Sequence, residues 1–381
     1  MLGCLPTNVA ALLLTLPLVG CTFYTGPPTG GNGTPVVEPP GGSTPDPGAS
    51  ELDGGSEPEG KWQNVTANLA GLRSACGNLS LVAAHPTEDM VVAAVANRGL
   101  WATTDGGKSW KALGLGALST EVNNLCTSIV FDPKDPNVFW ESGINGLVGV
   151  LKTVDAGKHF TGFDVLNYVE SLSVDFSDPD RETLLLGGHE TLQEIKRSTD
   201  GGKTFEEIGA QFPASADVTT FPLVLDANTY LMGSPVHSGG QAGIYRSDDA
   251  GDTWSLVSPI GGQNPPLLSS DGLIYWSLPK AGGLVKSSDR GQTFSVVVGA
   301  NLLQTFTPVE LPGHRVAAVS ARHIVVSSDQ GEHWRFATTA LPYAIAGFSY
   351  SPAQKAFFVW HSTCADDNSV PRNAIERFDF E

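Results

Sequence analysis

Two glutamates and a histidine are the residues of this chain best suited to acid–base chemistry. Glu141 follows the apolar run Val138-Phe139-Trp140, and His189 and Glu190 lie in the segment Gly188-His189-Glu190. Glycoside hydrolysis needs one carboxyl group that donates a proton and a second that acts as base or nucleophile. Glu141, His189 and Glu190 are therefore our candidate catalytic residues. In the alternative interpretation they are solvated side chains of surface loops.

A second set of side chains could bind a ligand. Arg98, Arg322 and Arg372 carry guanidinium groups, whose planar fork matches a carboxylate with two hydrogen bonds. His237 and Asp366 lie in polar segments that we also expect to be loops. We take these five residues as candidate ligand contacts. Surface arginines also form ordinary ion pairs, which is the alternative role.

The elements that position these residues are indicated by one stretch that occurs six times. Each copy reads Ser/Thr-x-Asp-x-Gly-x-x-Trp/Phe, and the clearest runs from Ser198 to Phe205. Asp accepts hydrogen bonds from nearby backbone N–H groups, and Gly adopts the positive φ that a tight turn needs. Repetition every 40 to 50 residues predicts a repeat architecture. The aspartates are Asp105, Asp155, Asp200, Asp249, Asp289 and Asp329.

These six stretches resemble the Asp-boxes, or BNR repeats, of sialidase-type β-propellers. The resemblance implies that the six aspartates are structural and lie in hairpin turns on the face opposite the active site. It also implies that ligands bind on the other face, at the mouth of the central channel, where we expect our candidate residues. We expect each aromatic residue to fold back onto its own blade and to bury its ring there.

The repeat length predicts the number of blades. Residues 61–381, divided by a repeat of about 45 residues, give about seven blades. One blade lacks the stretch, and we expect both chain ends to build it, with residues 61–66 as its last strand and 374–380 as its third. This closure removes exposed sheet edges. The prediction is an all-β fold, a single seven-bladed β-propeller of four-stranded antiparallel blades.

Residues 1–60 differ in composition from the remainder. Residues 1–21 have no charged side chain and contain an apolar run too short to span a bilayer, which is typical of a signal peptide. The tetrapeptide that ends at Cys21 resembles a bacterial lipobox, which implies lipid attachment there; an ordinary secreted protein is the alternative. Residues 22–60 are rich in Gly and Pro and lack Lys and Arg, which predicts a disordered tether. We expect a lipid-anchored cell-envelope protein, and Thr22 favours the outer membrane.

Charge and cysteine content limit the partners. A formal net charge of −18 argues against nucleic acid, which needs a basic surface. We expect a monomer that binds a protein or a polysaccharide, with no cofactor. We predict no metal site, because the aspartates are dispersed and no paired Cys or His spacing occurs. In an exported protein two of Cys76, Cys126 and Cys364 are expected to form a disulfide, and we favour Cys76 with Cys126.

Three functions remain open. The first is a binding or assembly module without chemistry of its own, similar in repeat style to photosystem assembly factors and sortilins. The second is a glycoside hydrolase or lyase that acts on an extracellular polysaccharide, similar to xyloglucanase-type propellers, which normally use two propellers. The third, a sialidase, is disfavoured because an Arg-Ile-Pro tripeptide expected before the first Asp-box is absent. We favour the first, because a single propeller without a recognisable catalytic set needs no further assumption.

Overall fold

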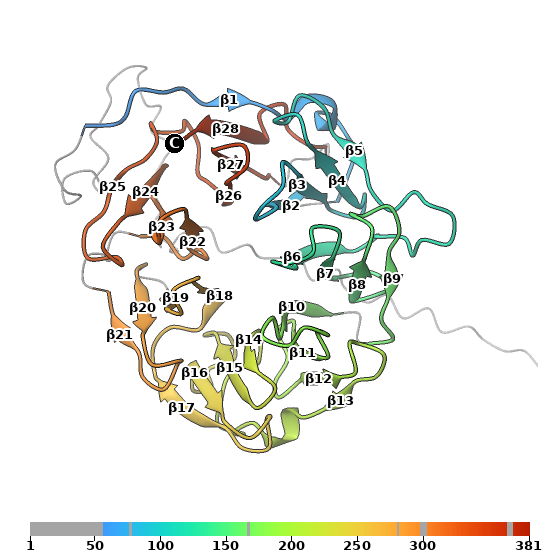
Figure 1. Cartoon of the computed structure of the whole chain (residues 1–381), viewed down its shortest axis with the longest axis vertical. Helices are drawn as coiled ribbons and strands as arrows, with labels where there is room; N and C mark the ends of the chain where they lie inside the picture. Colours follow the sequence, from blue (N-terminus) through green and yellow to red (C-terminus); the bar gives the residue numbers. More distant parts are fainter. Residues whose placement is uncertain (1–55, 76–77, 166–167, 280–281, 298–302, 364–368) are drawn as a thin grey trace, which may run out of the picture. The chain divides into compact units, whose positions relative to one another are not determined.

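The computed structural model describes residues 56–75, 78–165, 168–279, 282–297, 303–363 and 369–381, and the descriptions that follow concern these residues. The predicted signal peptide, Cys21 and most of the tether lie outside them. The strands form seven four-stranded antiparallel sheets. Figure 1 shows these sheets as seven blades arranged around a central axis. The predicted seven-bladed β-propeller is confirmed.

Within each of blades 1 to 6 the strands follow one another from the axis to the rim (Figure 1). Blade 1 contains β2 (Leu79–Ala84), β3 (Val91–Val95), β4 (Leu100–Thr103) and β5 (Lys111–Ala112). Blade 2 contains β6 (Leu125–Phe131), β7 (Phe139–Ile144), β8 (Val150–Thr153) and β9 (Thr161–Gly162). Blade 3 contains β10 (Val169–Val174), β11 (Thr183–Gly188), β12 (Ile195–Thr199) and β13 (Glu206–Glu207).

The second half of the ring repeats this plan. Blade 4 contains β14 (Phe221–Asp226), β15 (Thr229–Ser234), β16 (Gly243–Ser247) and β17 (Ser255–Ser258). Blade 5 contains β18 (Gln263–Leu268), β19 (Ile274–Ser277), β20 (Leu284–Ser287) and β21 (Ser295–Val296). Blade 6 contains β22 (Val309–Leu311), β23 (Arg315–Ser320), β24 (His323–Ser327) and β25 (Arg335–Phe336). Helical structure in the described residues is limited to two 3-10 turns, Ala67–Leu69 and Gly209–Gln211.

Blade 7 is built from both ends of the propeller sequence. It contains β26 (Gly347–Ser351), β27 (Ala356–Trp360), β28 (Ile375–Asp379) and β1 (Gln63–Asn64). β1 pairs with β28 in antiparallel register, with Gln63 opposite Arg377. The Val65 N–H also donates to the Ile375 carbonyl at 2.9 Å. The predicted closure by the terminal strands is therefore confirmed.

The hydrophobic core lies between neighbouring blades. In one such layer Val92 and Leu100 of blade 1 pack with Phe139 and Leu151 of blade 2. All five residues of β3 are buried, because a blade covers each face of this sheet. Each blade therefore depends on its neighbours for the burial of its apolar surface. In the described part of the chain, no helix has the length and apolar composition needed to cross a membrane.

The six repeated stretches form turns of one geometry, which we call the Asp turns. In every Asp turn the Ser or Thr hydroxyl donates to the Asp carboxylate at 2.7 to 2.9 Å. The backbone N–H four residues after the Asp donates to the same carboxylate at 2.8 to 3.0 Å. In the third copy the Thr204 hydroxyl also donates to Asp200, and such hydrogen bonds lower the pKa of Asp200 to about 2.

The aromatic residues of the Asp turns make one contact that we did not predict. As expected, Trp254 and Trp334 fold back onto their own turns, where their indole N–H groups donate to the Gly251 and Gly331 carbonyls at 3.1 and 2.8 Å. These rings also lie in layers shared with the preceding blade. Trp110 of blade 1 donates from its indole N–H to the carbonyl of Val65, next to β1 of blade 7, at 2.9 Å. The turn backbone also approaches the preceding blade closely: a Cβ on Gly251 would lie 2.5 Å from Ile208 Cδ1. The Asp turns therefore join neighbouring blades.

Candidate functional site

The two faces of the ring carry different connections. Because antiparallel strands reverse direction, the Asp turns and the connections between first and second strands lie on one face, which we call the turn face. The connections between second and third strands, and those between blades, lie on the other, which we call the turn-free face. The predicted ligand contacts that the structure describes all lie in connections on the turn-free face.

Three predicted residues come together on this face at blades 3 and 4. The Glu190 carboxylate lies 4.0 Å from His189 Nε2 and 3.9 Å from His237 Nδ1. On the other side of His189, Nδ1 lies 2.6 Å from Glu170 Oε2. We call these four residues the His–Glu cluster. The hydrogen bond to Glu170 raises the pKa of His189, so this imidazole is positioned to hold or to donate a proton.

The loop of His237 is held by a carboxylate that sequence reasoning did not single out. Asp217 accepts hydrogen bonds from the backbone N–H groups of His237 (2.9 Å), Ser238 (2.7 Å) and Gly239 (3.1 Å). Burial acts to raise the pKa of Asp217, but these backbone donors outweigh it and the net shift is downward. Asp217 therefore fixes the loop, and with it one wall of the cluster, as an ionised group.

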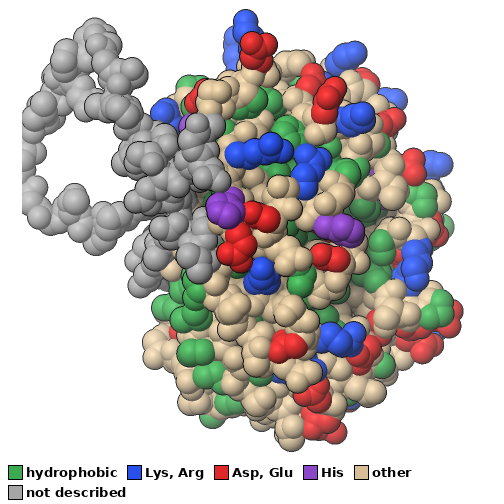
Figure 2. All heavy atoms as spheres, turned by 60° about the vertical axis from the view of Figure 1, so that its left-hand side comes forward, with side chains coloured by type: hydrophobic (Ala, Val, Ile, Leu, Met, Phe, Trp, Pro, Cys, Tyr) green, Lys and Arg blue, Asp and Glu red, His purple; other side chains and the backbone are tan. Residues whose placement is uncertain are grey.

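Apolar side chains surround the His–Glu cluster. Tyr168, Leu192 and Val236 are 46%, 59% and 49% exposed, and each lies within two residues of a cluster member. Ten large apolar side chains are exposed in the described residues, and five belong to connections on the turn-free face: Leu147, Tyr168, Leu192, Val236 and Ile260. Figure 2, by comparison, shows a side of the molecule on which acidic and basic side chains are interspersed and apolar groups are small. Exposed apolar surface beside a polar centre is typical of a binding surface.

Glu141 is not where we predicted it. We expected this glutamate in a loop at the channel mouth, but β7 continues through it and its side chain is completely buried. Asn124 Nδ2 donates to one of its oxygens at 3.3 Å, and burial raises the pKa of Glu141 to about 8. A carboxyl group in this position contacts no solvent. The predicted pair of Glu141 and Glu190 therefore does not meet at the surface.

The three predicted arginines lie on consecutive blades. Arg98, Arg322 and Arg372 are exposed in the turn-free connections of blades 1, 6 and 7. Arg98 donates from Nε to the carbonyl of Arg73 at 2.7 Å. In the described residues, no side chain contacts more than one of the three guanidinium groups. Asp366 lies outside the described residues. A three-arginine clamp stays a prediction.

Of the three cysteines in the predicted disulfide, only Cys126 lies in the described residues. Cys126 carries a free thiol in this structure, whereas we expected a disulfide with Cys76. Its Sγ lies 3.6 Å from the Ser128 carbonyl, and burial raises the pKa of the thiol. The favoured pair of Cys76 with Cys126 is therefore not formed in this structure. Cys76 and Cys364 lie outside the described residues, so a disulfide between these two stays a prediction.

The structure also places together a tyrosine and a glutamate that we did not predict. The Tyr343 ring lies 4.6 Å from the ring of His361, next to the partly buried carboxyl group of Glu376. Burial raises the pKa of both Tyr343 and Glu376. A phenol with a raised pKa is a poor nucleophile. Tyr343 lies in the connection before β26 and Glu376 lies in β28. They meet only in the folded chain, so the sequence carries no local pattern that would have pointed to this contact.

One group of side chains on the turn face has donor atoms suited to a metal ion. Ligand atoms of Asp271, Glu310 and His314 lie within 4.8 Å of one another. Ser270 already donates to Glu310 from its backbone N–H (2.8 Å) and its hydroxyl (2.6 Å). These hydrogen bonds explain the position of Glu310 without a cation, so the group supports no metal chemistry by itself.

Comparison with known proteins shows the fold but not the family. No protein-family profile matches the sequence, and no curated protein matches it. Among solved structures, a GH74 enzyme of Niastella koreensis aligns with a TM-score of 0.60 and 18% identity over 81% of this chain. The chain spans 54% of that enzyme, about half of its length.

Two further structures are similar over most of this chain. YCF48 bound to D1 peptide aligns with a TM-score of 0.57 and 13% identity, over 87% of this chain and 98% of YCF48. The extracellular domain of a putative one-component system of B. thetaiotaomicron aligns with a TM-score of 0.55 and 11% identity, over 84% of this chain and 40% of that one. At these identities the likeness concerns the fold alone.

Proposed function

We propose that this protein is an extracytoplasmic binding module without catalytic chemistry, whose partner is a protein that docks on the turn-free face at blades 3 and 4. One observation carries the proposal. Tyr168, Leu192 and Val236 expose apolar surface around the His–Glu cluster, in the region where Asp217 fixes the loop of blade 4. Exposed apolar side chains that gather in one region of a surface mark a site of protein interaction.

The chemistry of this surface favours a polypeptide over a polysaccharide. Leu192 and Val236 are aliphatic, and of the three framing side chains only Tyr168 offers a ring on which a sugar could stack. Glu190 is exposed and Glu170 partly so, which favours a partner with a basic or hydrogen-bond-donating group at the centre of the contact. The alignment with YCF48 along nearly its whole length supports the same choice, because that structure holds a peptide.

A glycoside hydrolase or lyase is the second candidate, and one observation favours it. Glu170 and Glu190 lie on opposite sides of His189, so two carboxylates and an imidazole with a raised pKa occupy one site. The test is incubation with a panel of plant, bacterial and sialylated polysaccharides. If the protein releases reducing ends or unsaturated products, and both Glu170→Gln and Glu190→Gln lose this activity, the hydrolase or lyase would replace the binding proposal. We expect no release from any of these polysaccharides.

The location of the protein is part of the proposal. The six Asp turns match the Asp-box, or BNR, pattern, which supports a place among exported propellers of that type. The lipobox-like tetrapeptide ending at Cys21 supports a lipid anchor, with the propeller held away from an outer membrane by residues 22–60. The monomeric state is likewise proposed.

A photo-cross-linking experiment tests the docking surface. The full-length protein, expressed in the cells that produce it, would carry p-benzoylphenylalanine in place of Leu192 on the turn-free face or of Leu268 on the turn face; both side chains are exposed. We expect a discrete adduct of higher mass from position 192 and none from position 268. The opposite pattern, or adducts of equal yield at both positions, would contradict the proposed surface.

A further inference from the structure

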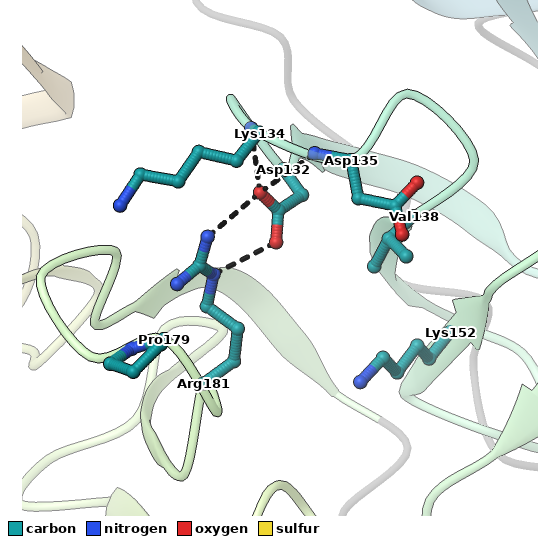
Figure 3. Close-up of a pocket in the computed structure, with 7 residues that line it drawn as sticks. All are labelled: Asp132, Lys134, Asp135, Val138, Lys152, Pro179 and Arg181. Carbon is teal, nitrogen blue, oxygen red and sulfur yellow. Dashed lines mark hydrogen bonds and ion pairs between the residues drawn. The ribbon is translucent and has the colours of Figure 1, made fainter.

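A pocket lies on the turn face between blades 2 and 3, on the side opposite the proposed docking surface. It encloses about 310 Å³ and is lined mainly by Asp132, Lys134, Lys152 and Arg181. Figure 3 shows these side chains arriving from both blades: Asp132 and Lys134 after β6, Lys152 on β8 and Arg181 before β11. Ligand pockets begin at about this volume.

One of the two carboxylates in the pocket is already paired with a cation. Asp132 Oδ2 accepts from Arg181 Nε at 2.8 Å, and Oδ1 accepts from Arg181 Nη2 at 3.0 Å and from the Lys134 backbone N–H at 2.8 Å. The second carboxylate, Asp135, accepts from the backbone N–H of Asn137 at 3.0 Å and keeps its negative charge. The lining therefore has three cations and two carboxylates, and in the described residues neither Lys134 nor Lys152 has a carboxylate within ion-pair distance.

Lys152 is held in place without an ion pair. Its ammonium group lies 4.7 Å from the centre of the Trp140 ring, and no carboxylate lies within ion-pair distance of it in the described part of the chain. Burial, and to a smaller degree Arg181, lowers the pKa of Lys152, whereas Asp132 acts to raise it. A partly buried cation without a counter-ion gains free energy when an anion approaches. Lys134 is exposed at the rim of the same pocket.

We propose that this pocket binds a small organic anion of monosaccharide size, a carboxylate or a phosphate monoester, chiefly through the ammonium group of Lys152, with the exposed Lys134 contributing from the rim. Arg181 is neutralised by Asp132, so the two lysines supply the positive charge of the pocket that is free to meet an anion. The whole protein carries a net charge of −18, so its overall field repels anions and local contacts must supply the affinity. The site is independent of the docking surface proposed above.

Three sugars that differ in one group test this proposal by titration calorimetry with the full-length protein. Glucuronate offers a carboxylate, glucose 6-phosphate a phosphate, and glucose neither. We expect saturable binding of at least one of the two anions and none of glucose, and their relative affinities identify the preferred group. Saturable binding of glucose with equal affinity, or of none of the three, would overturn the proposal.

Matched variants assign the binding to this pocket. Lys152→Met keeps an unbranched side chain on Trp140 and should weaken anion binding at least ten-fold. Lys134→Met, at an exposed position that the fold does not need, should weaken it as well, and keeps the test decisive if Lys152→Met does not fold. Lys108→Met removes an exposed lysine of an Asp turn outside the pocket and should leave the affinity unchanged. Equal affinity of Lys134→Met and the wild type would contradict the proposed site, whereas Glu190→Gln should have no effect.

Discussion

Replacement of Arg181 by Met isolates the energetic role of the buried ion pair between blades 2 and 3. The Asp132 and Arg181 side chains are only 5% and 8% exposed. The variant removes two charge-assisted hydrogen bonds, and loss of one partner of a buried pair costs about 3–5 kcal/mol. Asp132 keeps the backbone donors of Lys134 and Asp135, at 2.8 and 3.3 Å. We therefore expect the lower end of that range, about 3 kcal/mol, in the free energy of unfolding.

Denaturant unfolding at pH 7 gives this value, and Arg197→Met provides the control. Arg197 also forms an ion pair within blade 3, but its partner Glu206 is 55% exposed, and such pairs contribute at most about 1 kcal/mol. The double variant Asp132→Asn/Arg181→Met should recover part of the loss, since no buried charge is then left unpaired. Equal unfolding free energies of Arg181→Met and Arg197→Met would refute the reasoning.

The pH dependence of the same pair has a definite sign. Burial acts to raise the pKa of Asp132, but the Arg181 and backbone hydrogen bonds hold it below its ordinary value. A carboxyl group whose pKa is lower in the folded state stabilises the protein above its unfolded pKa of about 3.9 and loses this effect as the pH falls through the folded value. The difference between wild type and Arg181→Met should therefore become smaller below about pH 4.

Three further predictions concern other parts of the chain. Glu141→Gln should match the wild type in melting temperature at about pH 3.5 and exceed it at pH 8. The reason is that a folded-state pKa of about 8 destabilises the wild type once the pH rises above the unfolded value of about 4.3. An equal difference in melting temperature at the two pH values would contradict the burial of Glu141. Asp200→Ala should lower the melting temperature without loss of partner binding, since Asp200 accepts hydrogen bonds only within its own turn; lost binding by a folded variant would show that the turn has another role. Cys21→Ser should move the protein from the membrane to the soluble fraction and abolish incorporation of labelled palmitate, and unchanged fractionation would exclude the lipid anchor.

The architecture could be predicted from the sequence because its signal is local and repeated. Each Asp turn is encoded within eight residues, so six copies at similar spacing define the blades without knowledge of distant contacts. Closure by β1 and β28 followed from counting, since one blade lacked a turn and both chain ends had strand patterns. The packing of Trp110 between blades could not be predicted in this way, because it depends on how closely two blades approach.

The candidate site was predictable only in part for the same reason. His189, Glu190 and His237 were selected as polar loop residues, but their approach within about 4 Å depends on the relative positions of two blades. Glu170 and Asp217 were missed because an acidic residue in a strand or loop has no distinctive local pattern. Glu141 was misplaced because β7 extends beyond the apolar run that we took as the strand.

The affinity of the cross-linked partner for variants of the turn-free face tests the binding proposal most directly. Val236→Asp places a charge in the apolar frame of the His–Glu cluster, and Leu268→Asp places the same charge at an exposed position on the turn face. Measured by biolayer interferometry with the purified partner, binding should weaken at least ten-fold in Val236→Asp and remain unchanged in Leu268→Asp. Unchanged binding by a folded Val236→Asp variant would contradict the assignment of this face as the docking surface.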